Sequence, residues 1–208
     1  TSGTSTVPPM FIPGEYNPVI LANFVKRQKL IMSRIQQDES KGIKSNIDPR
    51  AFLILDDCLY DAKSWINEES TRYVFMNGRH IDLMTIITMQ YPLGIPPNLR
   101  TNIDYVFILR EPYIANRKRI YENYAGMFPT FEMFCQVMNA CTENYECLVL
   151  DNTCKTNKIQ DMVFWYKAPI RKNFRVGSPA FWQFHQKHYN PKHQTNQPPV
   201  APPRSRGA

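Results

Sequence analysis

The feature that most constrains the fold is a short apolar run, Ala51 to Leu55, that ends abruptly in the two carboxylates Asp56 and Asp57. An almost wholly apolar run of this length is typical of a parallel strand buried on both faces. In open α/β sheets, ligands bind beyond the carboxyl ends of the strands, so acids placed there can face a metal ion or a phosphate. A core strand that ends in a turn-forming aspartate pair is the alternative, and these residues alone favour it.

Two further apolar runs have the same character. Leu83–Met89 is rich in β-branched residues and ends in Gln90, and Tyr105–Leu109 ends in Arg110. Strands that alternate with helices, with connections long enough for parallel pairing, predict an α/β fold with a mostly parallel sheet flanked by helices. The other predicted elements are helices at 67–76, 97–102, 114–124, 130–140 and 179–189, and strands at 146–151 and 162–166.

A helix is predicted ahead of the first strand. Asn17 can cap its start, and Pro18 suits the first helical turn. Phe24 and Leu30 belong to the predicted apolar stripe, whereas Gln28 falls on the predicted polar face.

Composition divides the 208 residues into one sizeable domain with tails. Residues 1–15 read as an irregular N-terminal segment, 16–168 as the globular core, and 169–208 as a basic, proline-rich tail. The net charge is +7, and no acidic residue follows Asp161, so the excess positive charge lies in the tail. Such a tail suggests a polyanionic partner, nucleic acid first, although a solvated tail that only aids solubility is an equal alternative.

Within the tail, Arg171, Lys172 and Arg175 are the residues expected to contact a phosphate backbone. Phe181, Trp182 and Phe184 lie nearby in the sequence, and docking of a terminal helix explains them better than base stacking does. The five cysteines form no CxxC pair and fit no common zinc spacing, which favours reduced thiols in a reducing compartment. No apolar run approaches the ~18 residues that a membrane span needs.

Three predicted strands that end in Asp56-Asp57, Gln90 and Arg110 resemble the additional-strand ATPases, in which Walker B, a polar sensor and an arginine follow one another. The resemblance becomes more specific with Asn-Gly-Arg-His at 77–80 and Pro-Pro-Asn-Leu-Arg-Thr-Asn-Ile at 96–103. Together these motifs resemble the poxvirus-type DNA-packaging ATPases of large nucleocytoplasmic DNA viruses, in the FtsK–HerA superfamily. The similarity covers roughly residues 16–167, and it depends on the order and spacing of motifs that are individually weak.

The resemblance implies a site that uses ATP and Mg²⁺. Asp56 would bind Mg²⁺ through water, and Asp57 would be the catalytic base at a position where the superfamily often has Glu. Gln90 would sense the γ-phosphate or orient the attacking water. Arg100 or Arg110 could act in trans as an arginine finger, and the sequence does not choose between them. The alternative for either arginine is a structural salt bridge, which Arg110 could form with Glu111 or Asp104.

The resemblance also implies partners and a location. Members of the family couple ATP hydrolysis to moving double-stranded DNA into capsids, as ring-shaped homo-oligomers. We therefore expect double-stranded DNA, further copies of the chain in a ring (a hexamer) and capsid or other packaging proteins as partners. The expected location is the virion or the viral factory in the host cytoplasm.

The main departure from the family is that no GxxxxGKS or GxxxxGKT phosphate loop occurs in the sequence. The expectation is therefore a C-terminal portion of a longer ATPase, inactive alone, with the missing P-loop strand beside Leu83–Met89. One alternative is a P-loop-less DNA-binding or assembly subunit with the same fold. A weaker one is a nuclease that binds Mg²⁺ at Asp56-Asp57, although the strand lacks the additional acid or lysine that such sites usually bring.

Overall fold

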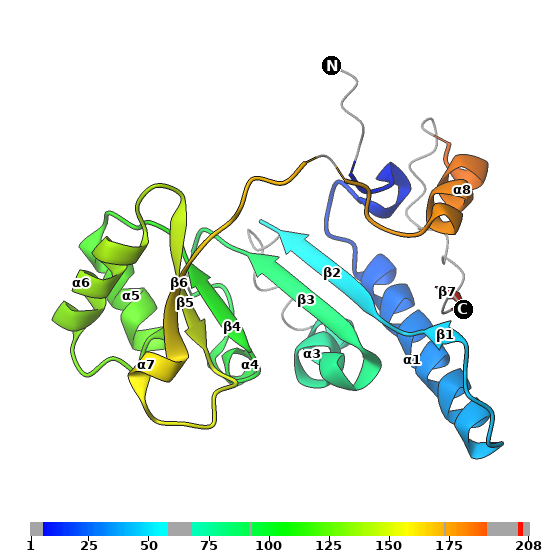
Figure 1. The fold of residues 1–208 in the computed structure, drawn as a ribbon, viewed down its shortest axis with the longest axis horizontal. Helices are drawn as coiled ribbons and strands as arrows, with labels where there is room; N and C mark the ends of the chain where they lie inside the picture. The colour runs from blue at the N-terminus through cyan, green and yellow to red at the C-terminus, as the bar shows by residue number, and fades with distance from the viewer. Residues whose placement is uncertain (1–5, 58–67, 92, 173, 191–203, 206–208) are drawn as a thin grey trace. The chain divides into compact units, whose positions relative to one another are not determined.

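A computed structural model of the protein describes residues 6–57, 68–91, 93–172, 174–190 and 204–205 (Figure 1). The chain divides into two compact units, one made of residues 1–88 and 171–208 and the other of residues 89–170. Each unit has its own sheet and its own hydrophobic cluster. This geometric division does not test the functional division predicted at 1–15, 16–168 and 169–208, which stays a prediction. No helix in the described part of the chain is long and apolar enough to cross a membrane.

The predicted N-terminal helix is present as α1, Pro18–Ser40. The Asn17 side chain caps it by accepting hydrogen bonds from the backbone N–H groups of Val19 (2.9 Å) and Ile20 (3.3 Å). The predicted stripe was wrong at two positions, because Leu30 is exposed and Gln28 is fully buried. The buried face follows helical spacing and consists of Leu21, Val25, Gln28 and Ile31.

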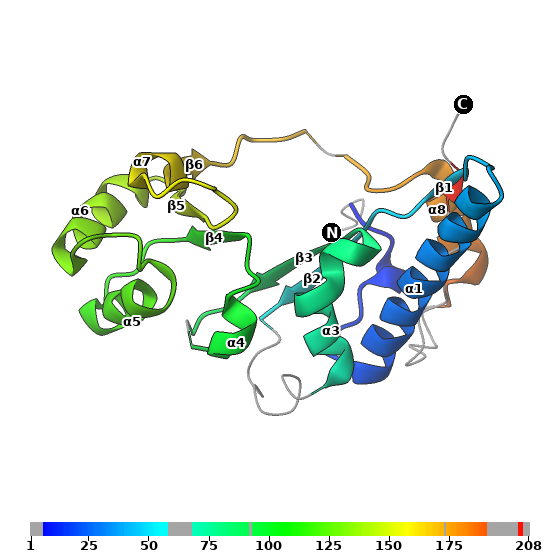
Figure 2. The ribbon, with the colours of Figure 1, turned by 90° about the horizontal axis from the view of Figure 1, so that it is seen from below.

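Two parallel strands form the sheet of the first unit. β2 (Ala51–Asp56) pairs with β3 (Leu83–Thr88) in a register that runs from Ala51 opposite Leu83 to Asp56 opposite Thr88. The connection contains α3 (Glu69–Asn77) and a 3-10 helix at Gly78–Ile81. Figure 2 shows α1 and α3 on one side of the strand pair. There they form a hydrophobic cluster of Leu21, Val25, Val74, Ile81 and Leu83, with Ala51 and Leu53 packed against it.

The buried amide of Gln28 connects α1 to the amino ends of both strands. Its Nε2 donates to the carbonyl oxygens of Pro49 (2.8 Å) and Ile81 (3.0 Å), each two residues before its strand begins. Its Oε1 accepts a hydrogen bond of 2.6 Å from Nη1 of Arg27. A buried amide is tolerated only when its polar atoms are paired in this way. Gln28 thus helps to fix the relative register of β2 and β3.

The second unit has an antiparallel sheet in the order β4-β5-β6. The mostly parallel sheet predicted from the sequence is therefore correct for β2 and β3 and wrong for these three strands. Two successive helices after β4 return the chain to the end of the sheet that it left, so β5 runs antiparallel to β4. The elements are α4 (Pro97–Arg100), β4 (Tyr105–Ile108), α5 (Ile114–Tyr124), α6 (Phe131–Cys141), β5 (Glu146–Asp151), α7 (Ile159–Met162) and β6 (Val163–Lys167).

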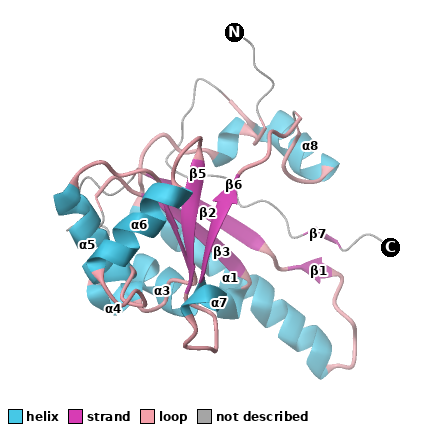
Figure 3. Cartoon of the chain, turned by 60° about the vertical axis from the view of Figure 1, so that its left-hand side comes forward, coloured by secondary structure: helices cyan, strands magenta, loops and turns pink. Residues whose placement is uncertain are grey.

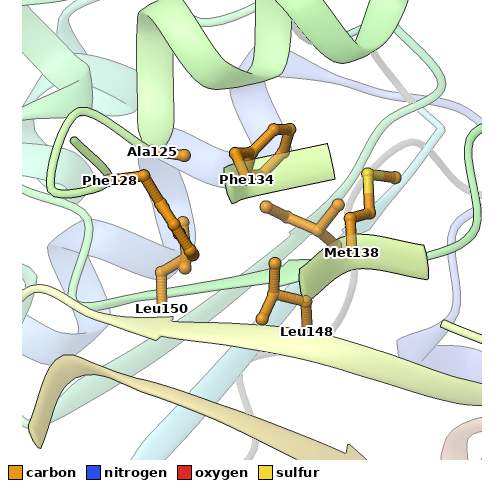
Figure 4. Close-up of a cluster of buried hydrophobic side chains, with 7 residues drawn as sticks. Ala125, Phe128, Phe134, Met138, Leu148 and Leu150 are labelled. Carbon is orange, nitrogen blue, oxygen red and sulfur yellow. The ribbon is translucent and has the colours of Figure 1, made fainter. Parts of the chain in front are cut away.

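The core of the second unit lies between α5, α6 and one face of its sheet. Figure 3 shows both helices beside the strands, and Figure 4 shows the side chains that meet there. Phe134 from α6 makes an edge-to-face contact with Phe128, with ring centroids 5.4 Å apart. The buried cluster consists of Ile108, Ala125, Phe128, Phe134, Met138, Leu148 and Leu150.

The segment after residue 170 returns to the first unit. Its helix α8 (Pro179–His188) contacts a short 3-10 helix at Pro9–Phe11, where the rings of Phe11 and Phe181 stack with centroids 4.4 Å apart. This contact confirms the predicted docking of the terminal helix through Phe181. A two-residue strand β7 (Arg204–Ser205) pairs antiparallel with β1 (Ile47–Asp48).

Candidate functional site

Asp56, Asp57 and Thr88 meet at the carboxyl ends of β2 and β3. The Thr88 hydroxyl donates to Oδ1 of Asp56 (2.5 Å) and accepts from the backbone N–H of Asp57 (3.1 Å). All three residues are exposed. The arrangement follows from the parallel register, which places Thr88 directly opposite Asp56. The hydroxyl therefore ties the two adjacent acids to the neighbouring strand.

The backbone at Asp57 departs from the strand. Its φ of 48° lies in the left-handed region, where aspartate is more common than most non-glycine residues. Consecutive residues of a regular strand point to opposite faces, so two adjacent acids could not both leave the same side. The left-handed residue ends β2 and is compatible with the observed exposure of both Asp56 and Asp57.

Thr88 is the residue of this site that the sequence interpretation missed. The signal lay in the starts of the two predicted strands, since pairing them in parallel with Ala51 opposite Leu83 places Asp56 opposite Thr88. Gln90, which was predicted as the polar sensor, is exposed and follows β3 by two residues. It belongs to the second unit.

Arg100 is held by contacts with two residues of α5. Its Nη1 donates a short hydrogen bond to Oδ1 of Asn123, and its guanidinium lies over the ring of Tyr124, 5.5 Å from the centroid. Nδ2 of Asn123 in turn donates to the carbonyl oxygen of Arg119 (2.7 Å). Burial raises the pKa of Tyr124, and the positive charge of Arg100 partly opposes that rise. These contacts join α4 to α5. They are a hydrogen bond and a cation–π contact, whereas the alternative to the arginine finger was a structural salt bridge.

Arg110 has a different environment. It is exposed and lies two residues beyond β4. Glu111, one of the two acids considered as a partner of Arg110, is engaged elsewhere. The Glu111 carboxylate instead accepts from the backbone N–H of Tyr113 (2.8 Å) and from Nδ2 of Asn116 (3.1 Å) at the start of α5. Arg110 is therefore the better candidate for contact with another molecule.

The predicted phosphate-contacting residues of the tail lie in the first unit. Arg171, Lys172 and Arg175 are all exposed. The Arg175 guanidinium lies over the ring of Trp182, 4.9 Å from the centroid, and Nε1 of Trp182 donates to the carbonyl oxygen of Val176 (2.9 Å). These contacts fix Arg175 beside α8.

The donor atoms at the carboxyl end of β2 fit a hydrated Mg²⁺. This ion prefers oxygen ligands and is usually held by one or two carboxylates together with water and substrate phosphates. Asp56 and Asp57 supply such oxygens at an exposed position. Across the residues that the structure describes, no group of three or more His, Cys, Asp or Glu side chains could hold a metal. The two carboxylates therefore fit a site in which water and a phosphate ligand complete the coordination of the ion.

The chain is similar to several viral proteins. It is 44% identical over 186 residues to protein L437 of Acanthamoeba polyphaga mimivirus, a match that covers 89% of this chain and 64% of the relative. It is 38% identical over 164 residues to protein 088R of Invertebrate iridescent virus 3, covering 79% of this chain and 58% of the relative. The chain thus spans less than two thirds of the length of these two relatives.

Comparison with solved structures gives a weaker similarity. The genome packaging NTPase B204 from Sulfolobus turreted icosahedral virus 2, in complex with ATP-gammaS, matches with a TM-score of 0.45 at 16% identity. The match covers 74% of this chain and 66% of that chain. At a TM-score below 0.5 and this identity, the similarity does not establish a shared fold.

Family membership rests on sequence. No model of a known protein family matches the chain. Protein 075L of Invertebrate iridescent virus 6 is 36% identical over 192 residues, which cover 91% of this chain and 70% of the relative. The alignment extends over most of both sequences, and the chain therefore belongs to the same family of viral proteins as 075L.

Proposed function

We propose that this chain is the part of an ATP-driven double-stranded DNA translocase that manages the metal ion and the attacking water during viral genome packaging. The observation that carries the proposal is the exposed Asp56-Asp57 pair at the carboxyl end of β2, bound to Thr88 at the carboxyl end of the parallel strand β3. The order of the Walker B-like, sensor-like and arginine motifs supports it, as does membership of a family with viral members.

Each residue of the site has a proposed role. Asp56 holds hydrated Mg²⁺, and Thr88 orients Asp56 and the Asp57 backbone. Mg²⁺, when bound, would neutralise charge on the phosphates of ATP. Asp57 accepts the proton of the attacking water, and Gln90 orients that water or senses the γ-phosphate. These roles need no further acid from the strand, which distinguishes the proposal from a nuclease.

The phosphate-binding loop is proposed to lie in a longer parent protein, outside the present sequence. The chain itself contains no such motif, and the first two relatives are longer than the region that they share with it. In the described part of the sheet, β3 pairs with β2 alone, so the other edge of β3 can accept the P-loop strand. This chain alone would then be inactive as an ATPase.

The proposed assembly is a homo-oligomeric ring, a hexamer by family resemblance, that encloses double-stranded DNA and works with capsid or other packaging proteins. Arg110 is the proposed arginine finger, because it is exposed whereas Arg100 is held by Asn123 and Tyr124. Arg171, Lys172 and Arg175 are proposed to contact the DNA backbone. The proposed location is the virion or the viral factory in the host cytoplasm.

The base assignment is tested in a longer family protein that contains a P-loop. Asp57→Asn should lower the maximal rate of DNA-stimulated ATP hydrolysis by about 10²–10⁴-fold and leave nucleotide affinity unchanged. Asp82→Asn is the matched control, because Asp82 is also exposed, has a φ of 49° and lies at the opposite end of the strand pair. Equal turnover in the two variants would reject the role of Asp57. If all full-length members of the family lack a P-loop, the alternative function, a DNA-binding or assembly subunit, is favoured.

The arginine finger is tested by mixing inactive subunits. Rings made only of Asp57→Asn or only of Arg110→Ala subunits should both hydrolyse ATP poorly. In mixed rings, some Arg110→Ala subunits retain Asp57 and receive Arg110 from an Asp57→Asn neighbour, so part of the activity should return. If mixing restores no activity although both variants enter the same rings, Arg110 does not act in trans.

A further inference from the structure

One face of the β2–β3 pair is apolar and exposed. Phe52 and Ile54 of β2 lie opposite Met84 and Ile86 of β3 in the parallel register. These four side chains, which we call the outer face, are 42%, 52%, 59% and 42% exposed. The alternate residues, among them Leu53 and Leu83, belong to the cluster beneath α1 and α3. The two faces of the same strands are thus both apolar, and in the described part of the first unit α1 and α3 pack on only one of them.

An exposed face of this kind is unusual for parallel strands, because these are normally buried on both sides by helices. A strand with one face in water alternates apolar and polar residues, whereas β2 and β3 carry apolar residues on both faces. Its four side chains expose an area on the order of 300 Å², comparable with the largest apolar patch of a typical monomer. Such a patch generally marks a contact surface.

We propose that the outer face binds an amphipathic helix from the part of the longer protein that lies outside this sequence. The width supports a single helix, because two strands about 4.8 Å apart match a helix about 10 Å in diameter. The first two relatives leave more than a third of their own length outside the match, which is ample for such a helix. None of the four residues is charged, so the surface suits an apolar helix stripe and not nucleic acid.

The position of the outer face connects this helix to the candidate site. The rows formed by Phe52 with Met84 and by Ile54 with Ile86 continue directly into the pair Asp56 and Thr88. A helix laid along these rows would shield the base of the site from water and leave its carboxylates at the open end. The inference rests on exposure, on register and on the longer parent protein proposed above, and it holds whether or not that protein hydrolyses ATP.

The test compares cysteine accessibility in this chain and in the longer family protein. Ile86→Cys should react with a maleimide rapidly in the 208-residue chain and at least 10-fold more slowly in the longer protein. Tyr113→Cys, at an exposed position of the second unit, is the control and should react equally in both. Labelling is quantified for each peptide by mass spectrometry, so that the native cysteines do not interfere. Equal labelling of Ile86→Cys in the two proteins would overturn the proposal.

The occupant is identified by photo-cross-linking from Ile86→Cys and Ile54→Cys with a benzophenone maleimide in the longer protein. The cross-linked residues should lie in the same chain, outside the present sequence, and three or four positions apart, as on one helix face. Cross-links to a second copy, to DNA or to residues two positions apart, as on one face of a strand, would overturn the proposal. Protection of Ile86→Cys in the isolated chain that grows with protein concentration would instead identify a second copy as the occupant. If Ile86→Cys does not fold, Met84→Cys replaces it.

Discussion

Replacing Thr88 with valine is the sharpest test of how the candidate site is held together. The substitution keeps the branched shape of the side chain and removes the hydroxyl that accepts from the N–H of Asp57 at 3.1 Å and donates to Asp56 at 2.5 Å. A hydrogen bond contributes about 1 kcal/mol net, because water competes for an exposed group. Losing it should therefore make exchange of the Asp57 amide hydrogen about 5-fold faster in Thr88→Val.

The assay is amide hydrogen exchange followed by NMR in the present chain, so it needs neither nucleotide nor a longer protein. The Ala51 amide is the internal control, because it donates to the carbonyl oxygen of Asp82 (3.0 Å) at the other end of the strand pair. Its exchange should not change. Thr88→Ser retains a hydroxyl and should restore most of the protection. If the Asp57 amide exchanges at the same rate in wild type and Thr88→Val, the hydroxyl does not organise the site.

Two predictions concern the contacts between α4 and α5. Arg100→Ala should lower the free energy of unfolding by about 1–3 kcal/mol in urea denaturation, because it leaves Oδ1 of Asn123 without its donor and removes a cation from the ring of Tyr124. Burial raises the pKa of Tyr124 above the ordinary value of 10.0, so the unfolded state ionises first. The stability that the buried, neutral Tyr124 contributes is present below pH ~10 and is lost as the pH rises further. In thermal denaturation above pH ~10, Tyr124→Phe should therefore lose less stability than the wild type.

Local features of the fold were predictable from the sequence. Asn17 and Pro18 mark the start of α1, and α5 has the predicted bounds of Ile114–Tyr124. The runs that form β2 and β3 are also evident, because β2 is apolar up to its final aspartate, β-branched residues are frequent in β3, and polar residues end both. These features depend on neighbouring residues, which a sequence pattern records directly.

Features that depend on distant residues were less predictable. The antiparallel direction of β4, β5 and β6 is set by how the intervening helices return the chain, and apolar runs do not encode it. The buried position of Gln28 has the same origin, since its partners Pro49 and Ile81 lie 21 and 53 residues away in the sequence. Its polar side chain resembles a surface residue until those carbonyl groups are placed.

The candidate site itself combines both kinds of information. The acids were evident from sequence, but their contact with Thr88 exists only in one register of β2 against β3. If β3 slipped by one residue against β2, the residue paired with Asp56 would point its side chain to the other face of the sheet. Gln28 helps to fix the register at the amino ends, and Thr88 closes it at the carboxyl ends, about 20 Å along the strands. The geometry around the two carboxylates therefore depends on a helix amide that no local motif of the site includes.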